Sequence, residues 1–225
     1  MMEIDDSWWH PRFLEWTFSL RKAVNILKGT ASDRKLRLLG LAFCRNLGDK
    51  LSDERMIQAV VVAERLVTGP VDDDEIIASR RILETAIGED RRGRHTTTDE
   101  QLVYCKQAVY GLLQEPMSHG IESTLDAAIR LLPSNNDRCR IHVEVLLDIF
   151  GHPHRPVAFS PEWRTSTAFA IAQSMHEARD FAPMPLLADA LQDAGCEVPE
   201  IIDHCRGPGP HVRGCWVVDG VLGKT

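Results

Sequence analysis

One stretch decides the fold class: Pro199-Glu-Ile-Ile-Asp-His-Cys-Arg-Gly-Pro-Gly-Pro-His-Val-Arg-Gly-Cys-Trp-Val-Val-Asp-Gly-Val-Leu-Gly223. Two short segments within it, 199–205 and 210–222, begin at a proline and end near a glycine. Proline suits the first turn of a helix, because its missing N–H is not needed there, and glycine suits the residue after the last turn. The stretch therefore predicts two short helices that a Gly-Pro-Gly-Pro turn folds into a hairpin.

The same pattern of helix starts and stops recurs toward the N-terminus. Pro11 precedes apolar residues at spacings of three and four, and Gly29 closes that segment. Further helix starts are expected at the N-caps Ser32, Ser52 and Thr98. No convincing alternation of apolar and polar residues, the pattern of a half-buried strand, occurs. The sequence predicts an all-α protein, an irregular multi-helix array or bundle of about ten helices.

Residues 88–98 are the best candidate for an exposed loop between helical groups. They include no apolar side chain that could hold the segment against a core. We expect the loop to separate two helical subdomains, 1–95 and 96–225, the second of which ends in the C-terminal hairpin. The helices are unequal in length and show no clean internal period, which argues against a regular repeat array.

The composition is that of an ordinary globular chain, with 44% hydrophobic and 26% charged residues among 225. No run approaches the roughly 18 apolar residues of a membrane span. The acidic N-terminus lacks the apolar segment of a signal peptide. Three of the six cysteines are scattered and three cluster near the C-terminus, and a chain with its own core needs no disulfide framework. We therefore expect a cytoplasmic protein without a membrane partner.

Charge is unevenly distributed along the chain. The net charge is −7, which argues against nonspecific nucleic-acid binding. Residues 21–55, however, hold nine Lys or Arg against four Asp or Glu. A basic face for RNA or an acidic partner is one interpretation, and a solvated helix surface is the one we favour.

Catalytic signatures are missing from the sequence, so no catalytic residue is assigned. There is neither a phosphate-binding loop nor a Gly-x-Ser-x-Gly turn. His176 and the glutamate after it begin like a zinc-protease helix, but Asp180 stands where the second histidine belongs. His152 and His154, just after Asp148, form a weak candidate for a divalent metal. We expect a protein that is not an enzyme.

The C-terminal stretch contains the densest group of metal-binding side chains: His204, Cys205, His211 and Cys215. His211 and Cys215 are four residues apart, so a helix over 210–222 would put them on one face. The turn before it would bring Cys205 close to both, and Cys196 or His204 would supply a fourth ligand. Such a mixture of cysteine and histidine predicts zinc, although the spacing matches no standard zinc finger.

Two other interpretations of the same residues stay open. In the first, which we favour, the hairpin is purely structural: Cys205 and Cys215 fill core gaps, and Trp216 is the buried anchor of its last helix. In the second, the hairpin is a binding site, in which Arg206, His211 and Arg213 recognise an anion beside Trp216. Arginine suits this role, because its guanidinium recognises carboxylates and phosphates through two hydrogen bonds.

Several blocks carry a family resemblance: Leu187-Ala-Asp-Ala-Leu-Gln-Asp-Ala-Gly-Cys196 with His204-Cys-Arg-Gly-Pro-Gly-Pro-His-Val-Arg-Gly-Cys-Trp-Val-Val-Asp219, then Lys28-Gly-Thr-Ala-Ser-Asp-Arg-Lys-Leu-Arg-Leu38 and Asp148-Ile-Phe-Gly-His-Pro-His-Arg-Pro-Val157. They resemble a large paralogous group of bacterial all-helical proteins that has no known activity. The resemblance implies a helical fold and a bacterial source. The group usually carries Asn and Phe at the positions of His152 and His154, which weighs against a metal there.

These observations lead to one functional hypothesis and one alternative. The leading hypothesis is a helical interaction or regulatory module that needs no cofactor and contacts a protein partner through the C-terminal hairpin. The alternative is a zinc-binding protein or metal-dependent enzyme that uses the C-terminal Cys/His cluster. Metal analysis separates the two.

Overall fold

The structure, a computed structural model, describes residues 13–92, 97–131, 136–152 and 157–224. Eleven α-helices and two short 3₁₀ segments occur in these residues, and no strand does, which confirms the all-α prediction. The α-helices are α1 Phe13–Leu27, α2 Asp33–Arg45, α3 Glu54–Thr68, α4 Asp73–Arg92, α5 Thr97–Leu112, α6 Met117–Leu131, α7 Asn136–Phe150, α8 Ser166–Ala178, α9 Met184–Asp193, α10 Pro199–Arg206 and α11 Trp216–Leu222. None of the described helices has the length and apolar composition that crossing a membrane requires.

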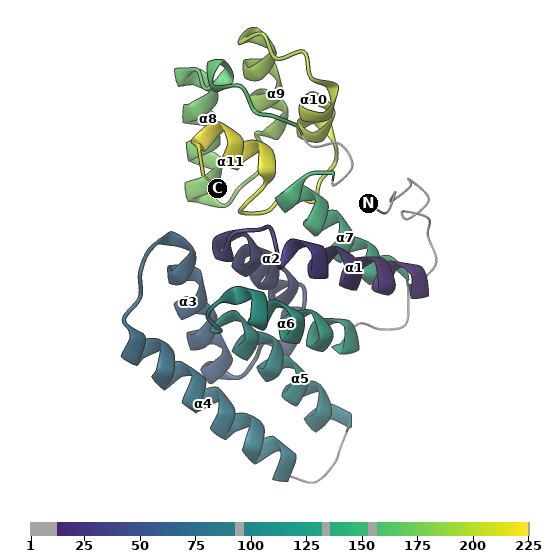
Figure 1. The fold of residues 1–225 in the computed structure, drawn as a ribbon, viewed down its shortest axis with the longest axis vertical. Helices are drawn as coiled ribbons and strands as arrows, with labels where there is room; N and C mark the ends of the chain where they lie inside the picture. Colours follow the sequence, from purple (N-terminus) through teal and green to yellow (C-terminus); the bar gives the residue numbers. More distant parts are fainter. Residues whose placement is uncertain (1–12, 93–96, 132–135, 153–156, 225) are drawn as a thin grey trace. The chain divides into compact units, whose positions relative to one another are not determined.

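The chain forms two compact units, residues 1–143 and 144–225. The division falls within α7, so the last two turns of this helix belong to the C-terminal unit. A domain boundary was expected near residue 95, which lies between α4 and α5. These two helices pack against each other within the N-terminal unit (Figure 1). The loop expected over 88–98 is shorter than predicted, since α4 continues through Arg92 and α5 begins at Thr97; residues 93–96 lie outside the described ranges.

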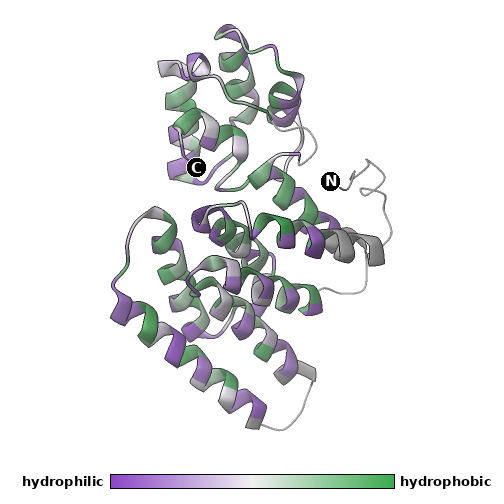
Figure 2. Cartoon of the chain, viewed as in Figure 1, coloured by the Kyte–Doolittle hydropathy of each residue, from purple (hydrophilic) through white to green (hydrophobic). Residues whose placement is uncertain are grey.

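In the N-terminal unit, α5 is the central helix and contacts α2, α3, α4 and α6. Figure 2 shows hydrophobic and hydrophilic residues interleaved along these helices, the pattern of helices that bury one side. The middle of α2 is buried on every side, from Leu36 to Cys44. Its Arg37 is 3% exposed and donates to the carbonyl oxygens of Leu112 and Gln114 at the end of α5. Burial lowers the pKa of Arg37, and these contacts satisfy the buried guanidinium.

A buried cation connects α3, α4 and α5. Lys106 on α5 is 2% exposed, and its Nζ lies 2.6 Å from an oxygen of Asp90 and 3.0 Å from one of Asp53. Asp53 also caps α3 by accepting from the backbone N–H of Arg55, so this cap is one residue later than the predicted Ser52. Hydrogen bonds from Arg55 lower the pKa of Asp53, against the opposing effect of its burial. These charges hold α4 to α5 where a domain boundary was expected.

Several basic residues of 21–55 pair with carboxylates from other helices of the same unit. The ion pairs are Arg21–Asp126, Lys28–Glu122, Arg45–Glu64 and Arg55–Glu89. Most of these side chains are substantially exposed, so each pair contributes about 0–1 kcal/mol to stability. Their main effect is to offset the local positive charge that the sequence contains.

The C-terminal unit packs α8 against α9 and α11, and α9 against α10. The predicted helix over 210–222 begins only at Trp216, so residues 207–215 form a loop and the hairpin has a wider connection than expected. In α11 the buried residues are Val217, Val218, Asp219 and Val221. Trp216 is half-buried and packs against the edge of this core, so it is not the fully buried anchor that the sequence predicted.

Helices α5 and α6 cross at two glycines, Gly111 and Gly120. A Cβ at Gly111 would lie 2.6 Å from the carbonyl oxygen of Gly120, and one at Gly120 would overlap the carbonyl oxygen of Gly111. Real Cβ atoms do not approach backbone atoms so closely. The crossing therefore requires hydrogen in place of a side chain at both positions.

Gly120→Ala is expected to destabilise the protein by about 3 kcal/mol or more, because the two helices must separate to admit the methyl group. The control is Gly69→Ala, where a Cβ meets nothing within 4 Å and φ is 173°, an extended value that alanine adopts freely. Chemical denaturation of both variants measures the effect. Equal midpoints for the two would contradict a backbone contact at the crossing.

His142 is an unusual core residue of the N-terminal unit. It is 0% exposed and stacks on Phe43, with ring centroids 4.8 Å apart and planes 9° from parallel. Neither ring nitrogen has a hydrogen-bond partner among the described residues. Burial lowers the pKa of His142 from 6.5 to about 4, so the folded state holds this imidazole neutral at neutral pH.

Acid should therefore weaken the fold through this residue. Between pH 6.5 and 4 the unfolded chain binds a proton at His142 that the folded chain does not, so stability falls as the pH decreases through this window. The contribution amounts to about 3 kcal/mol at most. His142→Phe keeps the stacking and removes the titration, so it should lose less stability over this range than the parent chain. Denaturation curves at several pH values test this, and parallel pH profiles would refute it.

Candidate functional site

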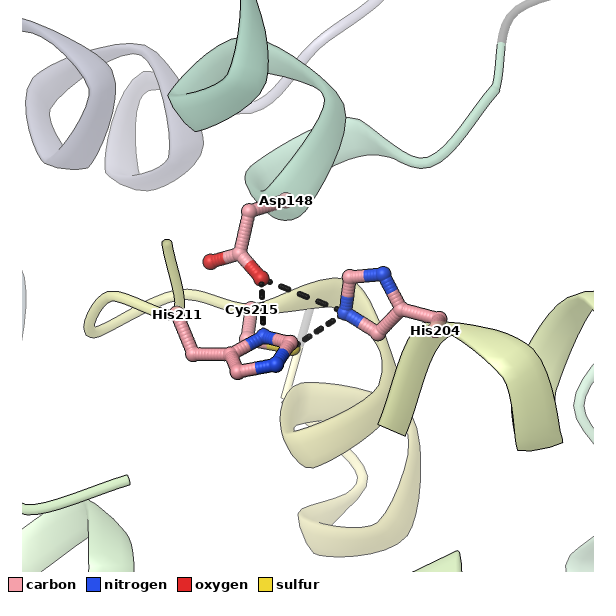
Figure 3. A group of neighbouring side chains, drawn as sticks. All are labelled: Asp148, His204, His211 and Cys215. Carbon is pink, nitrogen blue, oxygen red and sulfur yellow. Dashed lines mark hydrogen bonds and ion pairs between the residues drawn. The ribbon is translucent and has the colours of Figure 1, made fainter. Parts of the chain in front are cut away.

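Four metal-binding side chains converge in the C-terminal unit: Asp148, His204, His211 and Cys215 (Figure 3). Asp148 lies in the last turn of α7 and His204 in the last turn of α10. His211 is in the loop 207–215, and Cys215 is the residue that precedes α11. One donor atom from each residue can be chosen so that all four lie within 4.8 Å of one another. The ends of two helices and one loop thus supply a single small group of donors.

Asp148 is at the centre of the group. Its Oδ1 lies 2.9 Å from Nδ1 of His211 and 3.2 Å from Nε2 of His204. Its Oδ2 accepts a hydrogen bond of 2.8 Å from the backbone N–H of Val212. The side chain is only 2% exposed. Burial alone would raise the pKa of Asp148, but hydrogen bonds with the two imidazoles and Val212 outweigh it and lower the pKa below its usual value.

Cys215 lies on the inner side of the group. Its Sγ is 3.1 Å from Nε2 of His204, the nitrogen that also faces Asp148. The residue is 0% exposed, and burial, together with the charge of Asp148, raises the pKa of the thiol well above 9. In the absence of a metal, Cys215 is therefore a protonated thiol. Only a cation within the group would favour the thiolate.

The loop 207–215 presents His211 through a constrained backbone. Gly209 has a φ of 82°, and a Cβ there would lie 2.9 Å from the backbone nitrogen of His211. A larger residue at this position would be strained and would push the histidine away from Asp148. Pro208 and Pro210 fix their own φ angles on either side. The sequence of this turn thus positions the imidazole, although no helix contains it.

The geometry suits a tetrahedral cation. Zinc binds nitrogen or oxygen at about 2.0–2.2 Å and sulfur at about 2.3 Å, which places neighbouring ligand atoms roughly 3.3–3.6 Å apart. Three of the separations, 2.9, 3.2 and 3.1 Å, are a few tenths of an ångström shorter, and all four donors lie within 4.8 Å of one another. Small side-chain movements would accommodate the ion. One carboxylate, two imidazoles and one thiol are ligand types that zinc accepts, and magnesium and calcium accept neither thiol nor imidazole readily.

The structure brings together three of the four predicted ligands, His204, His211 and Cys215, and it places Asp148, not Cys205, beside them. Cys205 is on the side of α10 that faces the core, where burial raises the pKa of its thiol to about 12. His211 and Cys215 do meet, but across a loop and not on one helical face. In the sequence Asp148 lies near His152 and far from the C-terminal histidines, so no spacing rule connects it to them; His154 lies outside the described residues.

The anion site expected from Arg206, His211 and Arg213 finds less support in the geometry. Arg206 on α10 already donates to Asp189 at 2.7 Å and to Gln192, and both of these acceptors are on α9. His211 faces the carboxylate of Asp148. Arg213 is a half-buried residue of the loop. Arg206 and His211 therefore each face a carboxylate of the chain itself, which would repel a bound anion.

Comparisons with known proteins provide no relative from which a role could be inferred. No protein-family model, curated protein or solved structure matches the chain. Any functional assignment therefore depends on the geometry of the site.

Asp148→Ala should destabilise the C-terminal unit by about 3–5 kcal/mol, because it leaves the Val212 N–H and two imidazoles without their buried acceptor. Asp189→Ala is the matched control: this aspartate is 63% exposed and pairs with Arg206 at the surface. Its removal should cost about 1 kcal/mol or less. Urea denaturation compares the two, and an equal loss in both variants would show that Asp148 has no special structural role.

Proposed function

We propose that this protein binds one zinc ion through Asp148, His204, His211 and Cys215. The observation that carries the proposal is the convergence of these four donors within 4.8 Å in a buried part of the C-terminal unit. Charge balance supports it as well. Zn²⁺ together with one carboxylate, one thiolate and two neutral imidazoles has no net charge, which is the least costly state for a buried site.

The ion would have a structural role. Four protein ligands complete a tetrahedral shell and leave no open position for a substrate, as in structural zinc sites elsewhere. The ligands come from the end of α7, the end of α10 and the segment before α11, so the ion would fix the loop 207–215. The ion would add to the constraints that Gly209 and the contacts with Asp148 already place on this loop, and it would stabilise the start of α11, which is only seven residues long and marginal by itself.

We further propose that the zinc-fixed C-terminal unit acts as an interaction or regulatory module in the cytoplasm of a bacterium. The absence of catalytic signatures from the sequence and the resemblance to a bacterial group support this role. A protein partner is the expected ligand of the module. Nucleic acid is not, because the net charge is −7 and the basic segment 21–55 pairs with carboxylates of its own unit.

Elemental analysis of the purified full-length chain should find about one zinc per molecule. His211→Ala and Cys215→Ala should each reduce the content at least tenfold, and a chelator should lower the melting temperature of the parent chain but not that of these variants. Cys205→Ala is the control, because it removes a buried thiol of α10 that lies outside the four-donor group.

That control should keep its zinc. A parent chain that takes up no zinc at equimolar concentration would refute the proposal. Equal loss of zinc from the Cys205 and Cys215 variants would assign the metal to the ligand set predicted from sequence instead.

A further inference from the structure

A cleft of 490 Å³ in the C-terminal unit adjoins His204 on α10. Its volume is within the range of small-molecule sites, about 300–1,000 Å³. Its apolar wall consists of half-buried side chains that the packing of the unit leaves partly open, namely Leu147, Phe150, Val157 and Trp216. His152 and His204 add imidazole edges to the lining. The cleft shares His204 with the four-donor group, and the other three donors are not part of its lining.

Trp216 gives the cleft a rigid aromatic wall. Atoms of its indole lie 3.5–3.7 Å from the position that a Cβ of Gly151 would occupy, so the ring lies beside Gly151. The imidazole of His204 packs against the indole at a centroid distance of 5.4 Å. A ring held by neighbours in this way loses little entropy when a ligand binds to it. Tryptophan is also the best of the aromatic side chains at attracting a cation.

Two carboxylates line the same cleft. Glu200 and Asp203 are three residues apart on α10 and therefore share one side of the helix. Both are exposed, and neither side chain has a hydrogen bond or ion pair in the part of the chain that the structure describes. The neighbouring Arg206 does not neutralise them, since it binds Asp189 on α9. The cleft thus combines an aromatic wall with two unpaired negative charges.

We infer that this cleft binds an alkylammonium group, either as a free primary amine or as the lysine side chain of a partner. The ammonium lies against Glu200 and Asp203, and the methylene chain covers Phe150 and Trp216. Ion pairing and the attraction between cation and indole favour the charged amine over a neutral or anionic ligand of the same length. The inference does not depend on bound zinc, because its contacts are made by α10, the end of α7 and Trp216.

Isothermal titration calorimetry of the full-length chain with hexylammonium tests the inference, with 1-hexanol and hexanoate as probes of equal length. Hexylammonium should bind at least about tenfold more tightly than either. The double variant Glu200→Gln, Asp203→Asn should reduce its affinity to that of hexanol, and Trp216→Phe should weaken it less than Trp216→Ala. Glu197→Gln removes an exposed carboxylate outside the cleft lining and should leave the affinity unchanged.

A blocked lysine, N-acetyl-lysine methylamide, identifies the source of the amine. Binding as tight as that of hexylammonium assigns a lysine side chain, and binding only of hexylammonium assigns a free amine. Equal affinities for hexylammonium and hexanol would overturn the inference, as would unchanged binding in the double variant. Zinc content measured on the same samples keeps the two proposals apart. A parent chain that contains zinc but does not prefer hexylammonium contradicts the cleft alone, and a parent chain that prefers hexylammonium but contains no zinc contradicts the metal site alone.

Discussion

The C-terminal unit depends on one buried carboxylate. Asp148 is almost completely removed from water, and a charge in that position is tolerated only if its oxygens are fully occupied. The loop 207–215 supplies a hydrogen-bond partner for each carboxylate oxygen: the ring of His211 contacts Oδ1, and the backbone N–H of Val212 donates to Oδ2. The end of α10 adds His204. These hydrogen bonds to Asp148 therefore fix the shape of the loop, and α11 starts where the loop ends.

Most of the helical fold could be predicted from local sequence, because the signals for helix ends act over a few residues. Ser32 caps α2 through its hydroxyl as expected, and proline begins α10. Predictions failed where tertiary contacts overrode those signals. The charged residues after Gly88 predicted a loop, yet α4 continues to Arg92. There Asp90 forms an ion pair with Lys106 on α5. Such an ion pair lies outside the reach of a local pattern.

The candidate site was predictable in part for the same reason. His204, His211 and Cys215 are close in sequence, so their chemistry suggested a cluster at once. Asp148 is 63 residues before His211, and only the folded chain brings it to them. Cys205 was expected in the cluster because a helix over 210–222 would have faced it; with a loop there, Cys205 lies in the hydrophobic core and outside the four-donor group. The spacing of residues in the sequence indicated which types of metal donor would cluster, and the fold determines which residues lie together.

The crossing of α5 and α6 has a consequence for how this chain can evolve. At Gly111 and Gly120 the two backbones touch, so a side chain at either position requires the helices to move apart. Such a movement would also disturb Thr124, whose buried hydroxyl donates to the carbonyl oxygen of Ala108 across the same crossing. Mutational drift can therefore not replace one glycine and compensate at a distance. Descendants of this chain that retain the crossing should retain both glycines, even where the surrounding surface has diverged completely.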